Sequence, residues 1–151
     1  MMRVLITIFI FLGLFISCSK SPECWGDNKN KGIINSSIRI DCSPTTTQQN
    51  YVITSDSVYQ QTFSNTITGQ ANCQLPSIDF SKETLLGVSA TGQCEIKVIR
   101  EVESIDKENK YHYKVKVRSC GLCKKMAYID NWVTVPKLPN GWTVTFEVDD
   151  K

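Results

Sequence analysis

The spacing of apolar and polar residues predicts a chain built mainly from β-strands. Residues 94–98 and 111–118 alternate between the two kinds at period two, and Asp106–Asn109 between them are turn-forming residues. Two alternating runs joined by such a turn predict a long antiparallel hairpin. Shorter apolar runs predict the remaining strands, at 32–40, 51–53, 84–90, 131–135 and 142–148.

The predicted hairpin has a register that places its apolar side chains on one face. The expected cross-strand pairs on the core side are Ile96 with Val117, Val98 with Val115, and Val102 with Tyr111. The other face is polar and charged. In the same register Lys97 lies opposite Lys116, which is an unfavourable like-charge pair.

A helix-start cluster at Thr54–Ser57 interrupts the strands. It predicts one short helix near residues 56–64. The expected inner face of this helix consists of Val58, Tyr59, Thr62 and Phe63. The expected fold class is therefore mainly β (α+β), an antiparallel sheet or sandwich-like domain with one short helix, stabilised by disulfides.

The N-terminus has the pattern of a bacterial lipoprotein signal. Arg3 precedes an apolar run at 4–16 that ends at Ser17–Cys18. A run of about 7–15 apolar residues closed by a small residue is typical of a secretory signal peptide and is too short for a membrane span. The cysteine directly after the small residue resembles the site that is acylated in lipoproteins. We therefore expect residues 1–17 to be a lipoprotein signal peptide, with an ordinary signal peptide or an uncleaved anchor as the alternatives.

The rest of the chain is expected to form one tethered domain. Residues 18–23 form a lipidated tether and residues 24–151 a single β-rich domain, within the usual size of about 100–150 residues. Each buried methylene of an acyl chain contributes about 0.8 kcal/mol, so Cys18 would bind the lipid bilayer. The expected localisation is the bacterial cell envelope, at the outer membrane. A formal net charge of only +2 argues against nucleic acid as a partner, because that binding needs concentrated positive charge.

Six further cysteines predict a disulfide framework, because an even number in an exported chain is typical of paired cysteines. They are Cys24, Cys42, Cys73, Cys94, Cys120 and Cys123. The expected pairs are Cys24 with Cys42, and Cys73 and Cys94 with Cys120 and Cys123 in either order.

Cys120 and Cys123 form a CxxC motif, for which redox catalysis is an alternative hypothesis. Redox motifs usually place the first thiol at the N-terminus of a helix in a βαβ unit. Here a predicted strand precedes the motif. A structural role is therefore favoured over redox catalysis and over metal binding, and neither a metal site nor a cofactor is expected.

His112 is the only histidine, and the expected register places it on the polar face of the hairpin opposite Glu101. A catalytic histidine needs a positioned nucleophile and an orienting partner. The sequence has no GxSxG motif to supply the nucleophile. We therefore expect a surface histidine and no catalytic residue.

Four basic residues of the hairpin form a candidate binding face. They are Lys97, Lys114, Lys116 and Arg118. The simpler interpretation is a solvated, partly ion-paired face, and the alternative is a docking face for an acidic partner or an anionic polymer. Trp132 and Trp142 are expected in the core, whereas their exposure on one face would favour sugar binding.

Residues 76–87 read Pro-Ser-Ile-Asp-Phe-Ser-Lys-Glu-Thr-Leu-Leu-Gly. This segment resembles the Pro-x-Ile/Val-Asp-Phe-Ser-Lys segment of proteins related to the C-terminal domain of the protease-complex subunit PrcB. The resemblance continues through Ala90–Gly92, the hairpin and residues 132–137. Ser119–Cys123 looks like the same segment of small Bacteroidetes lipoproteins. The resemblance implies a lipoprotein accessory to a protease complex, and it brings no catalytic residue with it.

These features together predict a membrane-anchored envelope lipoprotein that acts as a non-enzymatic protein-interaction module. Its expected partner is an unidentified envelope protein, for which a protease is the most concrete candidate. A glycan-binding surface lipoprotein is the main alternative, and a thiol–disulfide oxidoreductase is the next.

Overall fold

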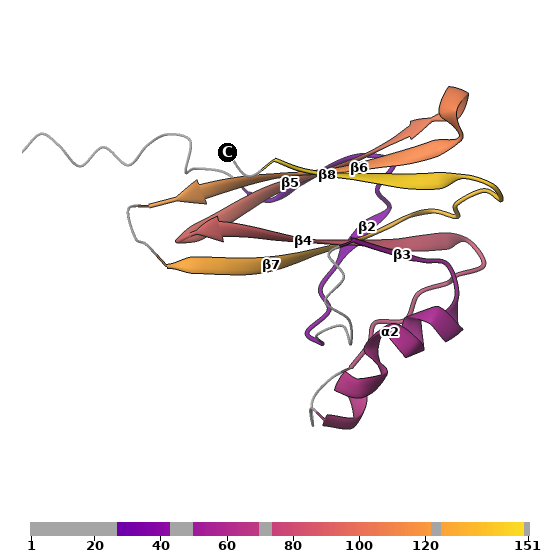
Figure 1. The fold of residues 1–151 in the computed structure, drawn as a ribbon, viewed down its shortest axis with the longest axis horizontal. Coiled ribbons are helices and arrows are strands. Elements are labelled where there is room, and N and C mark those ends of the chain that lie inside the picture. The colour runs from indigo at the N-terminus through magenta and orange to yellow at the C-terminus, as the bar shows by residue number, and fades with distance from the viewer. Residues whose placement is uncertain (1–26, 43–49, 70–73, 122–124, 150–151) are drawn as a thin grey trace, which may run out of the picture.

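The computed structural model describes residues 27–42, 50–69, 74–121 and 125–149. Their strands form two four-stranded sheets that lie face to face, and one helix packs on the outer side of one sheet (Figure 1). The expected mainly β, sandwich-like fold with one helix is confirmed. The predicted signal peptide and tether, and with them Cys18, Cys24, Cys73 and Cys123, lie outside the described residues. Within the described ranges, no helix has the length and apolar character needed to cross a membrane.

Sheet A is the layer with the strand order β1-β5-β6-β8. Its strands are β1 (Lys29–Gly32), β5 (Glu95–Ile105), β6 (Lys110–Cys120) and β8 (Thr143–Asp149). The central strands β5 and β6 are antiparallel, whereas the edge strands β1 and β8 run parallel to their neighbours. The expected antiparallel pairing therefore holds only at the centre of this sheet.

Sheet B has the order β2-β7-β4-β3 and is antiparallel throughout. Its strands are β2 (Ser36–Ile38), β7 (Met126–Pro136), β4 (Glu83–Gln93) and β3 (Asn50–Ile53). The segment 32–40, expected to be one strand, instead changes sheets. The Ile33 N–H donates to the Val102 carbonyl in sheet A, and the Asn35 N–H donates to the Thr134 carbonyl in sheet B, at 2.9 and 2.8 Å.

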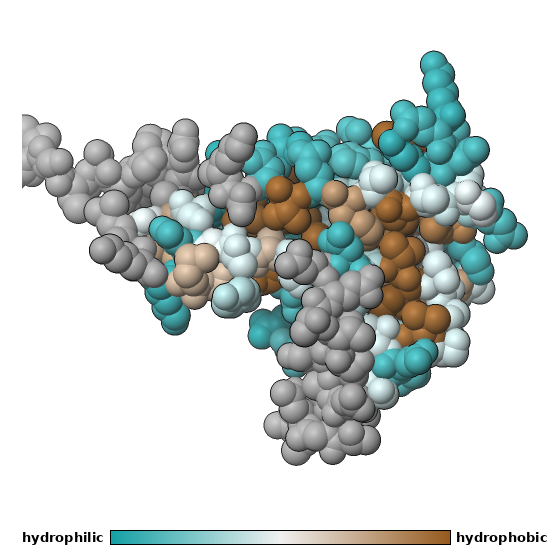
Figure 2. All heavy atoms as spheres, viewed as in Figure 1, coloured by the Kyte–Doolittle hydropathy of each residue, from teal (hydrophilic) through white to brown (hydrophobic). Residues whose placement is uncertain are grey.

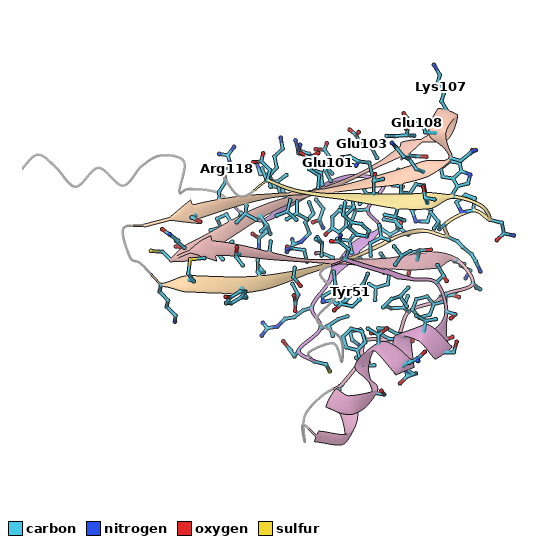
Figure 3. All side chains as sticks on the ribbon, in the orientation of Figure 1. Tyr51, Glu101, Glu103, Lys107, Glu108 and Arg118 are labelled. Carbon is cyan, nitrogen blue, oxygen red and sulfur yellow. The ribbon has the colours of Figure 1, made fainter. Side chains whose placement is uncertain are left out.

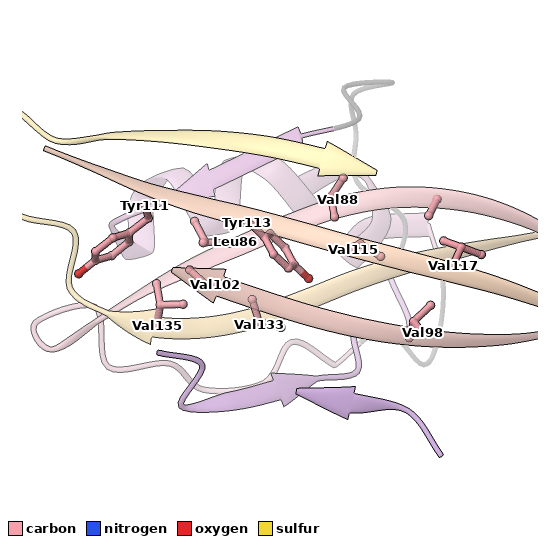
Figure 4. Close-up of a cluster of buried hydrophobic side chains, with 11 residues drawn as sticks. Leu86, Val88, Val98, Val102, Tyr111, Tyr113, Val115, Val117, Val133 and Val135 are labelled. Carbon is pink, nitrogen blue, oxygen red and sulfur yellow. The ribbon is translucent and has the colours of Figure 1, made fainter. Parts of the chain in front are cut away.

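The first core lies between the two sheets (Figure 4). Alternate residues of a strand point to the same side, so the inward positions of the four long strands meet there. The buried residues of this core are Leu86, Val88, Ala90, Val98, Val102, Tyr111, Tyr113, Val115, Val117, Val133 and Val135.

The register of the hairpin differs from the expected one. Val98 lies opposite Val117, and Val102 lies opposite Tyr113, so each partner is displaced by two residues. A shift by an even number leaves every side chain on its original face. The predicted core face of the hairpin is therefore correct although its predicted pairs are wrong.

The turn of the hairpin explains this displacement. A 3-10 turn at Asp106–Glu108 is followed by Asn109 in the left-handed conformation, with φ 50° and ψ 50°. This short connection places Ile105 opposite Lys110. The expected pairs were centred one residue earlier in the chain, between Asp106 and Lys107.

A second core lies between the outer face of sheet B and helix α2 (Asp56–Gly69). Its buried residues are Cys42, Tyr51, Ile53, Tyr59, Phe63, Ile78, Phe80, Leu85 and Trp132. Trp132 projects from β7 opposite Gly87 of β4. A Cβ atom on Gly87 would lie 2.1 Å from Cζ3 of the indole. The missing side chain at Gly87 therefore lets the indole lie directly against β4.

Helix α2 begins where the sequence predicts and extends beyond the expected end at residue 64. The Ser55 hydroxyl accepts a hydrogen bond from the Val58 N–H at 3.4 Å. Tyr59 and Phe63 are 3% and 0% exposed, whereas Val58 is 41% exposed. The placement of Val58 on the inner face was therefore wrong, because the helix meets the sheet along the Tyr59–Phe63 side.

Helix α2 packs beneath only one end of sheet B (Figure 1). We call the outward positions there the covered half, consisting of Leu85, Gly87, Trp132 and Thr134. We call the outward positions further along β4 and β7 the open half. The open half consists of Ser89, Thr91, Gln93, Met126, Tyr128 and Asp130. Trp132 is 2% exposed, whereas Tyr128 is 83% exposed.

Candidate binding surfaces

The basic residues Lys97, Lys114, Lys116 and Arg118 occupy alternate positions of β5 and β6. These positions form the outer face of sheet A. The labelled side chains of Glu101, Glu103 and Arg118 point away from the sandwich on this side (Figure 3). In the space-filling view the same edge of the molecule is lined by hydrophilic residues (Figure 2). The structure thus brings the four predicted basic residues onto one surface.

Acidic neighbours neutralise part of this surface. Glu147 forms an ion pair with Lys114, and Glu95 forms one with Lys97 at 2.9 Å. The hydrogen bond from Lys114 lowers the pKa of Glu147. Lys116 and Arg118 form no ion pair within the described part of the chain. Of the four predicted residues, these two remain for an acidic ligand.

His112 has more partners than the sequence indicated. It lies opposite Glu103 rather than Glu101. Its Nδ1 atom lies 2.9 Å from Thr145 Oγ1, and its Nε2 atom lies 3.2 Å from Glu147 Oε2.

A hydroxyl, an imidazole and a carboxylate in this arrangement have the composition of a nucleophilic triad. The triad mechanism also needs oxyanion donors in a site that excludes water. Here the side chains of His112 and Glu147 are 27% and 44% exposed on the outer face of a sheet. The geometry therefore fits a surface hydrogen-bond cluster.

The described cysteines lie in two places. Cys42 belongs to the second core, and Cys94 joins β4 to β5 with a φ of 60°. Both are disulfide-bonded. Cys120 is 4% exposed at the end of β6, where its backbone forms a bridge with Cys94. Because Cys24, Cys73 and Cys123 lie outside the described residues, the pairing order stays a prediction.

The two tryptophans do not share a face. Trp132 lies under helix α2, whereas Trp142 precedes β8 and packs at the margin of the first core. The ring of Trp142 meets Tyr111 edge-on at 5.5 Å between centroids. The arrangement that would favour stacking on sugars is therefore not formed by these residues.

The open half of sheet B carries the most exposed large apolar side chains of β7. Tyr128 is 83% exposed and Met126, two residues before it, is 49% exposed. Beside them the Ser89 hydroxyl donates to Asp130 Oδ1 at 2.6 Å. Tyr and Met are enriched at protein interfaces. This site was not predicted because the strand was expected to begin at residue 131, although Ala127 and Ile129 extend the alternation back to residue 126.

A polar cluster lies behind the open half, between the sheets. Arg100 occupies an inward position of β5 and is 9% exposed. Its Nε–H donates to Asn131 Oδ1 at 3.1 Å, and Asn131 Nδ2 donates to the carbonyls of Val88 and Ile129. Burial lowers the pKa of Arg100, partly offset by Tyr113.

Arg100 was not predicted as a site residue either. Its position between Val98 and Val102 at period two was the signal for an inward side chain. The strong preference of arginine for the surface concealed that signal.

Within the described residues, no group of three or more His, Cys, Asp or Glu side chains is placed to hold a metal ion. No protein-family model, curated protein or solved structure matches this chain.

Proposed function

We propose that this protein is a membrane-anchored lipoprotein of the bacterial envelope that binds another protein without catalysing a reaction. The anchoring rests on the signal pattern at residues 1–17 and on Cys18. The outer membrane is the proposed location. The domain would then hold its partner close to that membrane.

The exposed Tyr128 ring supports this proposal most directly. It lies on the same strand as Trp132, but helix α2 covers Trp132 and leaves Tyr128 83% exposed. On β7, Met126 lies two residues before Tyr128 and extends the exposed apolar surface, and Asp130 lies two residues after Tyr128. An aromatic side chain beside a flexible thioether, bordered by polar groups, is a favourable surface for protein contact.

An envelope protease is the most concrete partner that we propose. This part of the proposal rests on the resemblance of residues 76–87 to the PrcB-related segment. The alternatives have less support. The tryptophans do not form a sugar-stacking face, and Cys120 lies buried at a strand end rather than exposed at a helix N-terminus.

Site-specific crosslinking in cells tests the interaction. A photoreactive phenylalanine analogue at position 128 should crosslink to one envelope protein, whereas the same analogue at Thr145, on the outer face of sheet A, should not. With the purified partner, Tyr128→Ala should weaken binding by about tenfold or more, corresponding to at least ~1.4 kcal/mol. Equal crosslinking from both positions, or an unchanged affinity, would contradict the proposed surface.

The anchor and the absence of catalysis are tested separately. Cys18→Ala should release the protein from membranes or leave an unprocessed precursor. Normal processing of that variant would remove the lipoprotein part of the proposal. A fluorophosphonate probe should leave Thr145 unlabelled, and labelling that depends on His112 would show an activated hydroxyl and contradict the non-enzymatic proposal.

A further inference from the structure

The Arg100 guanidinium is buried with few partners. It is 9% exposed, and Nε–H to Asn131 Oδ1 is its hydrogen bond within the described residues. No described carboxylate forms an ion pair with it. A guanidinium group has several further N–H donors in a fork that fits a carboxylate.

The remaining donors of Arg100 are not completely enclosed. Among the described residues, Trp132 Nε1 is the fully buried side-chain nitrogen that lacks a partner. The Nη groups of Arg100 therefore keep some exposed area, although the residue as a whole is only 9% exposed. A charge that is largely desolvated but still accessible at one end is strongly attracted to an incoming carboxylate.

Asn131, the hydrogen-bond partner of Arg100, lies beside an open strand edge. β2 pairs with β7 only along Trp132–Thr134. Further along β7, the described strands leave the edge at Met126–Asn131 without a neighbour on that side. Asn131, which accepts the hydrogen bond from Arg100, is the residue of this open stretch that lies next to the end of the β2 pairing.

The backbone of β7 presents hydrogen-bonding groups at this edge. The Thr134 carbonyl points toward β2, where it accepts from the Asn35 N–H at 2.8 Å. Alternate residues of a strand direct their peptide groups to the same side. Asp130 and Tyr128 therefore direct their N–H and C=O groups to the open edge, ready for a further strand.

An added strand would meet both the polar cluster and the exposed ring. Neighbouring strands lie about 4.8 Å apart, and their side chains alternate between the two faces. Inward side chains of the added strand would lie level with Asn131 and face Arg100. Outward side chains would lie beside Tyr128 and Met126.

We propose that the edge of β7 from Met126 to Asn131 binds an extended segment of the partner protein as an added strand, and that an Asp or Glu side chain of this segment binds Arg100. Main-chain hydrogen bonds give such complexes their affinity, and alternate side-chain contacts give them specificity. This inference rests on the proposed interaction function and names its ligand class.

The test begins with random peptides displayed on phage and selected on the full-length lipoprotein in detergent. Selected peptides should share one acidic residue at a fixed position among alternating apolar residues. A synthetic peptide from this set should protect the amides of Tyr128 and Asp130 from hydrogen exchange. Peptides without an acidic preference, protection at another surface, or recovery of no peptide would overturn the proposal.

A double-mutant cycle then locates the carboxylate. Replacing the acidic residue of the peptide by its amide should weaken binding to the wild-type protein by about tenfold. The same peptide change should have almost no effect on Arg100→Met. Lys107→Met, at an exposed basic residue of the hairpin turn, is the control and should bind like the wild type.

Denaturant unfolding checks that Arg100→Met is folded. The comparison of the acidic peptide with its amide form on the wild-type protein does not depend on any protein variant. Equal loss with Lys107→Met would overturn the proposal, as would self-association through β7 that excludes the peptides. A partner that crosslinks at position 128 but ignores Arg100→Met would defeat the added strand alone. Failure to crosslink would defeat the interaction function itself.

Discussion

The covered and open halves of sheet B are built from the same two strands and differ in what lies outside them. In the covered half, Trp132 fits against Gly87 and under helix α2, and it is 2% exposed. In the open half, Tyr128 projects from the same face of the same strand and is 83% exposed. An aromatic residue at an outward strand position thus stabilises the fold in one place and is available for binding in the other.

Truncating the two aromatic residues gives the largest contrast. Trp132→Ala should lower the free energy of unfolding by about 3–5 kcal/mol, because it removes a buried aromatic side chain from the second core. Tyr128→Ala should change it by less than about 0.5 kcal/mol, because its side chain is exposed. Urea denaturation of both variants measures the difference. Equal losses would show that the two halves are not distinct.

Gly87→Ala is the matched test of the close approach in the covered half. The added methyl group would lie 2.1 Å from the Trp132 ring, so the indole or the strand must move. Such overpacking costs about 1–3 kcal/mol. Thr91→Ala in the open half serves as the control and should have a much smaller effect on the urea midpoint.

The polar cluster behind the open half should contribute less than the aromatic core but more than a surface residue. Asn131→Leu removes the acceptor for the Arg100 Nε–H, which donates at 3.1 Å. Leaving a buried donor without its acceptor costs about 1–3 kcal/mol. Asp130→Asn, one residue earlier on the exposed side, is the control. If Asn131→Leu leaves the free energy of unfolding unchanged, the Arg100 Nε–H must find water as its acceptor instead.

The smallest effect is expected on the outer face of sheet A. Hydrogen bonding from Lys114 lowers the pKa of Glu147 below its usual 4.5. A lowered folded-state pKa stabilises the fold above the unfolded-state pKa, and this contribution is lost as the pH falls through the folded-state pKa. Glu147→Gln should therefore lower the urea midpoint slightly at pH 7 and leave it unchanged in strong acid. A difference that persists in strong acid would contradict this cause.

The sequence was sufficient to predict the faces of the hairpin but not its pairs. Period two places Val98, Val102 and Tyr113 on the core side whichever even register the turn selects. The turn selects the register, because Asn109 adopts the left-handed conformation and the Asp106–Asn109 connection places Ile105 opposite Lys110. Local alternation therefore does not determine it.

The candidate sites were harder to predict because exposure depends on distant segments. Nothing in the sequence near residues 126–132 distinguishes Tyr128 from Trp132, since helix α2 is what separates them. Arg100 follows the inward alternation, but its partner Asn131 lies on another sheet. The common face of Lys97, Lys114 and Lys116 was easier to predict, because the alternation of each strand alone places them there.

The short Asp106–Asn109 turn also has a consequence for the order of folding. β5 and β6 are joined by that turn, so their ladder closes through local contacts. The finished hairpin holds Cys94 next to Lys125, with a hydrogen bond of 2.9 Å from the Cys94 N–H to the Lys125 carbonyl.

That contact brings together the ends from which β4 and β7 extend. The β4–β7 ladder then closes from Gln93 and Met126 toward Glu83 and Pro136, with little additional loop entropy at each step. Trp132 meets Gly87 late in this sequence of events. We expect φ-values to be high in the hairpin and low at Trp132, and the reverse order would show that the second core nucleates folding.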